Sequence, residues 1–381
     1  MPPERLRMRA LATNPVEGAS TRFRVEQWRH HLYEERIDLE LDSFYPSAAS
    51  KVVYRDGHTL AKFRYFSNGA AKRIDVLRRL PEIADILFVH REVFPLGWPL
   101  LLNRLERFPG AIIYDYDDAL FVPQRQGRGV LEWAERLDAP SRLMRMSDVV
   151  LAGSPFLAEY ARRHSDRVTL LPTCIDTDRF RPGEAPRSRD RCVIGWIGSH
   201  STAKYLDSIL PALERVAASV SFELYVVGSP TPIPTHAFSV AHAEWTPERE
   251  IEDFQRCDIG IYPLWNDEWC LGKCGFKAIQ FMSCGVPVIA APVGVTRDII
   301  DDGHSGVLAS STEEWATALV RLISDSGLRR SLGQEGRRAI EQRYSLRAQA
   351  SAFTGAVREA TARAAGRSTR RRSGRRVWSS R

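Results

Sequence analysis

The residues of this sequence best suited to chemistry surround a glycine-flanked turn at positions 272–275. Gly272 and Gly275 carry no side chain, so the backbone N–H groups of the turn can approach a ligand closely. Apolar residues recur at helical spacing from Phe276 onward, and Gly285 ends the predicted helix. A glycine turn that leads into the start of a helix is typical of a binding site for an anion such as phosphate.

Basic side chains accompany this turn and a second glycine turn. Lys273 belongs to the first turn, and Lys277 follows it in the helix, where a surface lysine is the alternative interpretation. The second turn follows an apolar strand and contains Gly198 and Ser199, with Lys204 at the start of the next helix. Lysine ammonium groups, backbone N–H groups and helix N-termini all stabilise negative charge. We therefore predict that the two turns bind a diphosphate.

Polar residues also end two predicted strands in the first half of the chain. His90 and Arg91 end the segment 85–92, and three acids end the segment 111–118. Ligands of an open parallel sheet gather at the carboxyl ends of its strands, so we expect these side chains near a substrate. A structural histidine, local charge pairing and loop capping are the alternatives. No metal is expected here; the acids are Asp115, Asp117 and Asp118.

A glycine loop near the N-terminus has the same organisation. It follows the predicted strand 6–13 and precedes the predicted helix 23–32. Gly18, Arg22 and Arg24 lie in or next to this loop. They are predicted to contact a diphosphate or an anionic acceptor, and a solvated helix start is the alternative interpretation.

The elements that must position these residues alternate between strand and helix along most of the chain, which favours an α/β fold. With 381 residues, two domains are expected. We predict a first domain at 1–182, a linker at 183–190 and a second domain at 191–345. A helix at 346–365 and a disordered tail at 366–381 would follow.

Residues 281–288, Phe-Met-Ser-Cys-Gly-Val-Pro-Val, resemble the donor-binding segment of the GT-B-fold glycosyltransferases, specifically the retaining family 4 or group 1 enzymes. Residues 168–182 resemble the strand and exit loop that precede the linker in that family. The family has two glutamates in the donor segment, and Gly272 and Gln280 stand in their places. Ser199 occupies the place of a family arginine, whereas the family lysine is kept as Lys204.

The resemblance implies two Rossmann-like domains with parallel sheets facing across a cleft, and a C-terminal helix that crosses back to the first domain. It implies a retaining hexosyl transfer from a UDP- or GDP-sugar to a glycan, lipid-linked or small-molecule acceptor, as in polysaccharide biosynthesis. His90, Lys204 and Glu268 are the expected catalytic residues, with Glu268 or Asp267 replacing the missing first glutamate. The expected donor contacts are Gly18, Gly198, Ser199, Lys204, Lys273, Gly275, Phe276, Lys277 and Gln280. The expected acceptor contacts are Arg22, Arg24, Arg91, Asp115, Asp117 and Asp118.

Two other functions remain open. The loss of both family glutamates and of the arginine favours a catalytically silent scaffold that binds a partner. A sugar-nucleotide epimerase of the same fold would need acid and base carboxylates around the sugar, and few lie near the motif. Stabilisation by nucleoside diphosphates distinguishes a donor-binding protein from the scaffold.

Composition limits the partners and the location. Hydrophobic residues make up 44% and charged residues 27%, which is ordinary for a globular protein. The net charge of +7 comes from an arginine-rich C-terminus, so nucleic-acid binding by the folded body is not expected. The sequence predicts a cytoplasmic protein without a cofactor, whose arginine-rich tail could hold it at an anionic membrane surface.

Overall fold

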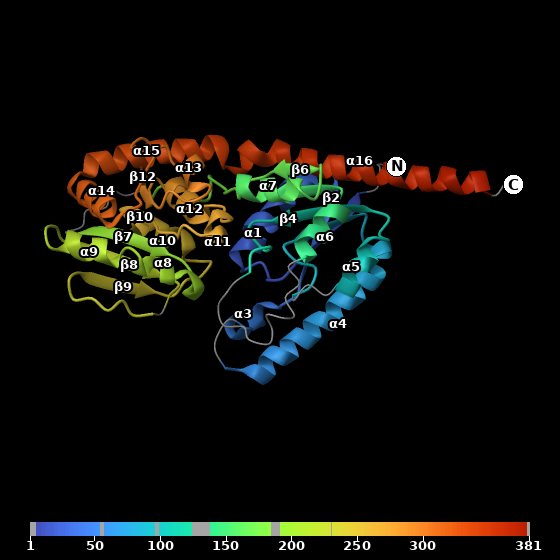
Figure 1. Ribbon diagram of the computed structural model, residues 1–381, viewed down its shortest axis with the longest axis horizontal. Helices are drawn as coiled ribbons and strands as arrows, with labels where there is room; N and C mark the ends of the chain where they lie inside the picture. The colour runs from blue at the N-terminus through green and yellow to red at the C-terminus, as the bar shows by residue number, and fades with distance from the viewer. Residues whose placement is uncertain are drawn as a thin grey trace. The chain divides into compact units, whose positions relative to one another are not determined.

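The computed structural model describes residues 5–53, 57–95, 99–123, 138–183, 191–229 and 231–378. The chain forms two compact units (Figure 1). Unit 1 comprises residues 1–173 and 350–381, and unit 2 comprises residues 174–349. Unit 1 therefore gives way to unit 2 earlier than the predicted boundary at 182, and most of the predicted linker lies outside the described residues.

The sheet of unit 1 has six parallel strands, and most of their residues are buried. Burial on both faces explains why the strands at 86–90, 111–116 and 149–152 are largely apolar, whereas those at 6–12 and 37–43 include charged residues. In spatial order they are β2 (Ile37–Ser43), β1 (Leu6–Ala12), β3 (Ile86–His90), β4 (Ala111–Tyr116), β5 (Val149–Ala152) and β6 (Val168–Leu170).

The helices of unit 1 differ from the prediction near the N-terminus. The expected single helix at 23–32 is broken, because Val25 leaves the helical region with φ −123° and ψ −65°. Ser154 caps its helix as its sequence position suggests, by accepting a hydrogen bond from the N–H of Leu157. The helices are α1 (Ala19–Arg24), η1 (Glu26–Trp28), α2 (Arg29–Glu34), α3 (Ser47–Val53), α4 (Thr59–Ile83), α5 (Pro99–Leu105), α6 (Ala139–Met146) and α7 (Pro155–Arg162).

The sheet of unit 2 also has six parallel strands. The edge strand β9 was not predicted, because its five residues are partly exposed and include polar side chains. In spatial order the strands are β12 (Val307–Leu308), β11 (Val288–Ala290), β10 (Ile259–Tyr262), β7 (Cys192–Ile197), β8 (Phe222–Val227) and β9 (Ser239–Ala243).

The helices of unit 2 include one split that the sequence periodicity did not reveal. The helix expected to start near Lys204 is divided into α8 (Lys204–Asp207) and α9 (Leu210–Ala217), and Pro211 lies in the first turn of α9, where its missing N–H costs no helical hydrogen bond. The helices are η3 (His200–Thr202), α8 (Lys204–Asp207), α9 (Leu210–Ala217), α10 (Glu250–Arg256), α11 (Glu268–Leu271), α12 (Phe276–Ser283), α13 (Thr296–Ile299), α14 (Thr312–Ser324) and α15 (Ser326–Arg343).

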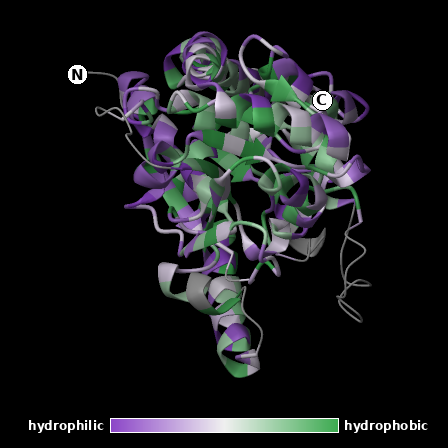
Figure 2. Cartoon of the chain, turned by 90° about the vertical axis from the view of Figure 1, so that its left-hand side faces the viewer, coloured by the Kyte–Doolittle hydropathy of each residue, from purple (hydrophilic) through white to green (hydrophobic). Residues whose placement is uncertain are grey.

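Two glycines let α10 and α12 pack closely on the sheet of unit 2. A Cβ atom on Gly195 would lie 2.1 Å from Cys257 Sγ, and one on Gly260 would lie 2.5 Å from Phe281 Cγ. In Figure 2 the hydrophobic colour gathers towards the interior, while the surrounding helices carry many hydrophilic residues. Substituting either glycine would push a helix away from the core.

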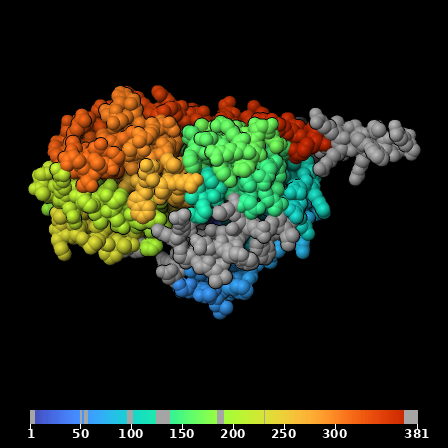
Figure 3. Space-filling model, in the orientation of Figure 1, coloured from blue at the N-terminus to red at the C-terminus, as the bar shows by residue number. Residues whose placement is uncertain are grey.

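The last helix, α16 (Leu346–Trp378), is longer than predicted. The segment after residue 365, predicted to be disordered, continues as helix to Trp378. Within unit 1, Phe353 stacks on Trp28 with ring centroids 4.3 Å apart, and Arg367 donates to Asp148 Oδ2 over 2.9 Å. Figure 3 shows residues of this helix, in red, lying along green residues of unit 1. Among the described residues, no helix combines the length and apolar character needed to cross a membrane.

Candidate functional site

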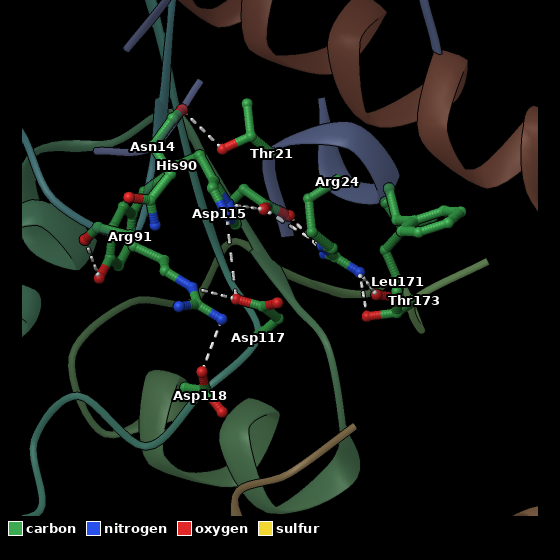
Figure 4. A network of polar contacts seen from close by, with 12 residues as sticks. Asn14, Thr21, Arg24, His90, Arg91, Asp115, Asp117, Asp118, Leu171 and Thr173 are labelled. Carbon is green, nitrogen blue, oxygen red and sulfur yellow. Dashed lines mark hydrogen bonds and ion pairs between the residues drawn. The ribbon is translucent and has the colours of Figure 1, made fainter. Parts of the chain in front are cut away.

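A buried histidine and aspartate form the centre of a polar cluster in unit 1 (Figure 4). Strands β3 and β4 pair so that His90 lies beside Asp115. His90 Nδ1 lies 2.7 Å from Asp115 Oδ2, and the two side chains are 1% and 0% exposed. An ionised carboxylate only accepts hydrogen bonds, so Nδ1 carries the proton and the ring orientation is fixed.

Arg24 completes this pair from α1. Its Nε donates to Asp115 Oδ2 over 3.2 Å, and a second nitrogen donates to Asp115 Oδ1. Its Nη1 donates to the carbonyl oxygen of Leu171 over 2.7 Å. The guanidinium is buried and compensates the buried carboxylate. Arg24 and Asp115 were each predicted to contact an acceptor, but in the structure they bind each other, so any action on an acceptor would pass through His90.

Arg91 joins the two following acids. Its Nε donates to Asp117 Oδ1 and its Nη2 to Asp118 Oδ2, each over 2.6 Å. Arg91 has a positive φ of 65°, and its carbonyl oxygen accepts a 3.0 Å hydrogen bond from the hydroxyl of Tyr114. Burial alone would raise the pKa of Asp117, but the charges of Arg91 and His90 outweigh it, and the pKa is lowered well below its usual range.

One polar atom in this cluster lacks a hydrogen bond. Among the described residues, His90 Nε2 is buried and has no hydrogen-bond partner, and Asp117 Oδ1 lies 4.0 Å away. A buried nitrogen without a partner is costly unless a water or ligand atom reaches it. His90 Nε2 is therefore a hydrogen-bond acceptor that the described residues leave unused.

The N-terminal glycine loop leads into a helix, but that helix, α1, begins at Ala19 and not at the predicted residue 23. Gly18 is the N-cap of α1, and a Cβ there would lie 2.9 Å from Asn14 Cβ. The guanidinium of Arg22 lies 4.6 Å from the centroid of the Phe23 ring. Contacts of Gly18 with a donor and of Arg22 with an acceptor stay predictions.

In unit 2, the turn after β7 packs closely against a side chain of that strand. A Cβ on Gly198 would lie 2.5 Å from ring carbons of Trp196. Ser199 begins η3 with reciprocal capping bonds to Thr202. The ammonium of Lys204 lies 4.9 Å from the centroid of the Trp265 ring, which belongs to the loop after β10. Since β7 and β10 are parallel neighbours, the two loops leave the same edge of the sheet.

The loop after β10 contains a short helix, α11, that was expected to be irregular. Asp267 caps it by accepting from the N–H of Cys270 over 2.7 Å, which leaves Glu268 exposed in its first turn. The ammonium of Lys273 lies 5.5 Å from the Trp269 ring centroid. Both candidate acids are exposed, and Asp267 is the one that caps the helix.

The central motif forms a turn and a helix as predicted. Gly275 has a φ of +65°, and a Cβ there would lie 2.3 Å from Ile299 Cδ1, so glycine is required. Helix α12 begins at the next residue, Phe276. Gln280 is buried, accepts a 2.8 Å hydrogen bond from Lys277 Nζ and donates a 3.1 Å hydrogen bond to Glu250 Oε1. The sequence analysis missed Glu250, which lies 30 residues away on α10 and belongs to no motif.

Residues 191–325 match the model of the family described as "Glycosyl transferases group 1". A D-inositol 3-phosphate glycosyltransferase of Stackebrandtia nassauensis is 31% identical over 205 residues, covering 46% of this chain and 45% of that protein. The same enzyme of Acidothermus cellulolyticus is 28% identical over 267 residues, covering 62% and 56%. The chain spans about half the length of these curated relatives.

The chain resembles the group 1 glycosyltransferases. Its fold is also that of a sucrose-phosphate synthase from Thermosynechococcus elongatus, with a TM-score of 0.67, 16% identity and coverage of 93% of this chain and 99% of that one. HepE of Anabaena, in complex with UDP and glucose, gives a TM-score of 0.65 at 14% identity, with coverage of 92% and 99%. The GT-B fold predicted from the sequence is therefore confirmed, with a parallel sheet in each of the two units.

Proposed function

We propose that this chain is a glycosyltransferase that uses a nucleotide-sugar donor. The observation that carries the proposal is the glycine turn after β7 with Lys204, whose ammonium lies 4.9 Å from the Trp265 ring in the loop after the neighbouring strand β10, within the region that matches the group 1 family. Loss of the sugar leaves negative charge on the departing nucleoside diphosphate, and these groups are suited to stabilise it. Lys204 would supply the positive charge, with the N–H group of Phe276; the N–H of Ser199 already donates to Thr202 Oγ1 over 2.9 Å.

The remaining donor contacts are proposed from the same unit. Lys273 and Lys277 border the central turn and would contact the diphosphate or the ribose. Gln280, predicted as a donor contact, is 0% exposed and bonds Lys277 and Glu250 instead. Glu268 would contact the transferred sugar, since it is exposed in the first turn of α11. UDP is the first nucleotide to test, because the HepE structure contains it; GDP is the second.

Unit 1 would bind the acceptor and the reacting sugar. The unpartnered Nε2 of His90 and the neighbouring Asp117 carboxylate would contact a hydroxyl group. Arg91, Asp118 and Arg22 would line the acceptor side. The acceptor would be a glycan, a lipid-linked molecule or a small molecule, and the anomeric configuration would be retained. The protein would be cytoplasmic and attached to an anionic membrane.

Measuring the Tm of the protein with UDP, with GDP and with the monophosphate AMP tests the proposed donor binding. One of the two diphosphates should raise the Tm of the wild-type protein, and Lys204→Ala should weaken that binding by about tenfold or more. Arg297→Ala, in the same unit, is the control, because Arg297 is an exposed residue of α13 outside the proposed contacts. Absence of stabilisation by either diphosphate would favour the silent scaffold.

A further inference from the structure

Three side chains of unit 2 form a polar chain between α10 and α12. Lys277 Nζ donates to Gln280 Oε1 over 2.8 Å, and Gln280 Nε2 donates to Glu250 Oε1 over 3.1 Å. Gln280 and Glu250 are 0% and 1% exposed. An ammonium only donates and a carboxylate only accepts, so the direction of both hydrogen bonds is fixed and the amide of Gln280 has a single orientation.

The charges of these three side chains explain why an amide stands between the lysine and the carboxylate. Lys277 is positive, Gln280 neutral and Glu250 negative, so the three side chains sum to zero. A carboxylate at position 280 would lie about 3 Å from that of Glu250 in the interior, where two like charges cannot both be tolerated. Among the described charged groups nearby, Asp253 accepts from the hydroxyl of Tyr225 and pairs with Arg249, so it belongs to a separate set of contacts.

The position of Lys277 connects these three side chains to the proposed donor site. Lys277 lies in the first turn of α12, two residues after Gly275, and its ammonium is 5.3 Å from the Phe254 ring centroid. A lysine side chain is flexible, so a fixed acceptor such as Gln280 Oε1 restricts where its charge lies. The buried Glu250 holds that acceptor in place through the amide.

We infer that Glu250 and Gln280 are positioning residues for Lys277. Glu250 carries the negative charge of the pair and thereby requires an amide, not a carboxylate, at position 280. The inference rests on the proposed function, because Lys277 is the group that would contact the nucleoside diphosphate. In the family, a glutamate at the position of Gln280 carries the negative charge. In this chain the negative charge is on Glu250 of α10, so the binding site is kept although α12 has lost the carboxylate.

A charge swap tests this inference. Gln280→Glu gives the three side chains a net charge of −1, and Glu250→Gln gives +1, whereas the double variant returns to zero. Each single variant should lower the Tm by about 5 °C and raise the Kd for UDP, or for GDP if that is the ligand of the wild type, about tenfold. The double variant should regain most of both losses.

A second background separates positioning from a purely structural role. In Lys277→Met, the change Gln280→Glu should still lower the Tm but should no longer change the Kd for the diphosphate. Additive effects of the two single changes on the Tm, or no recovery of affinity in the double variant, would overturn the inference. If the wild-type protein binds no nucleoside diphosphate, the proposed function fails instead, and the Tm cycle still measures the coupling between Glu250 and Gln280.

Discussion

Replacing Arg24 by methionine is the sharpest test of how unit 1 holds its buried cluster. The change keeps the length of the side chain but removes the charge that faces Asp115, a residue that is 0% exposed. It also removes the hydrogen bond to the carbonyl oxygen of Leu171. Breaking one partner out of a buried ion pair costs about 3–5 kcal/mol, and neither side chain is exposed enough for solvent to reduce that cost.

For a unit of this size, such a loss lowers the Tm by about 10 °C, which calorimetry or circular dichroism measures directly. Arg22→Met is the matched control on the same helix, where the side chain is only partly buried, and its effect should be about 1 kcal/mol or less. The double variant Arg24→Met/Asp115→Asn removes both charges and should recover at least half of the loss. A Tm for Arg24→Met within about 2 °C of the wild type would refute the view that this pair stabilises unit 1.

Three further outcomes follow from single contacts. Arg73 is 2% exposed and donates to the carbonyl oxygens of Ala12, Asp42 and Val93. Arg73→Leu should therefore lower the free energy of unfolding, measured in urea, by about 3 kcal/mol, and a loss below about 1 kcal/mol would contradict this. Gly275→Ala should weaken diphosphate binding at least tenfold by displacing the start of α12, as measured by titration calorimetry. The pKa of Asp117 is below its unfolded value of 3.8, so its stabilisation is present above about pH 4 and is lost as the pH falls further; Asp117→Asn should flatten that acid limb.

The sequence predicted best those features that depend on neighbouring residues. Apolar runs located the strands, because a strand buried on both faces needs a continuous hydrophobic segment. The Gly275 turn and the start of α12 were also predicted, since each depends on local backbone geometry. The strand β9 escaped because an exposed edge strand does not need an apolar sequence.

Contacts between distant residues could not be read from the sequence. Arg24 and Asp115 are 91 positions apart, and each was predicted separately as an acceptor contact. Only the packing of α1 against the end of β4 shows that they neutralise each other. The same holds for the bond between Gln280 and Glu250, because no local pattern identifies the residue that faces a given helix.

The helix α16 affects the order in which the two units can fold during synthesis. Unit 2 is one continuous stretch, whereas unit 1 needs residues from Ala350 onward, which are synthesised after unit 2. Until then, the carboxylate of Asp148 lacks Arg367, and Trp28 lacks the ring of Phe353. Unit 1 therefore cannot complete its fold until α16 has been synthesised, whereas unit 2 can fold before then. Chains released early, without the last helix, should be the ones that aggregate or are degraded.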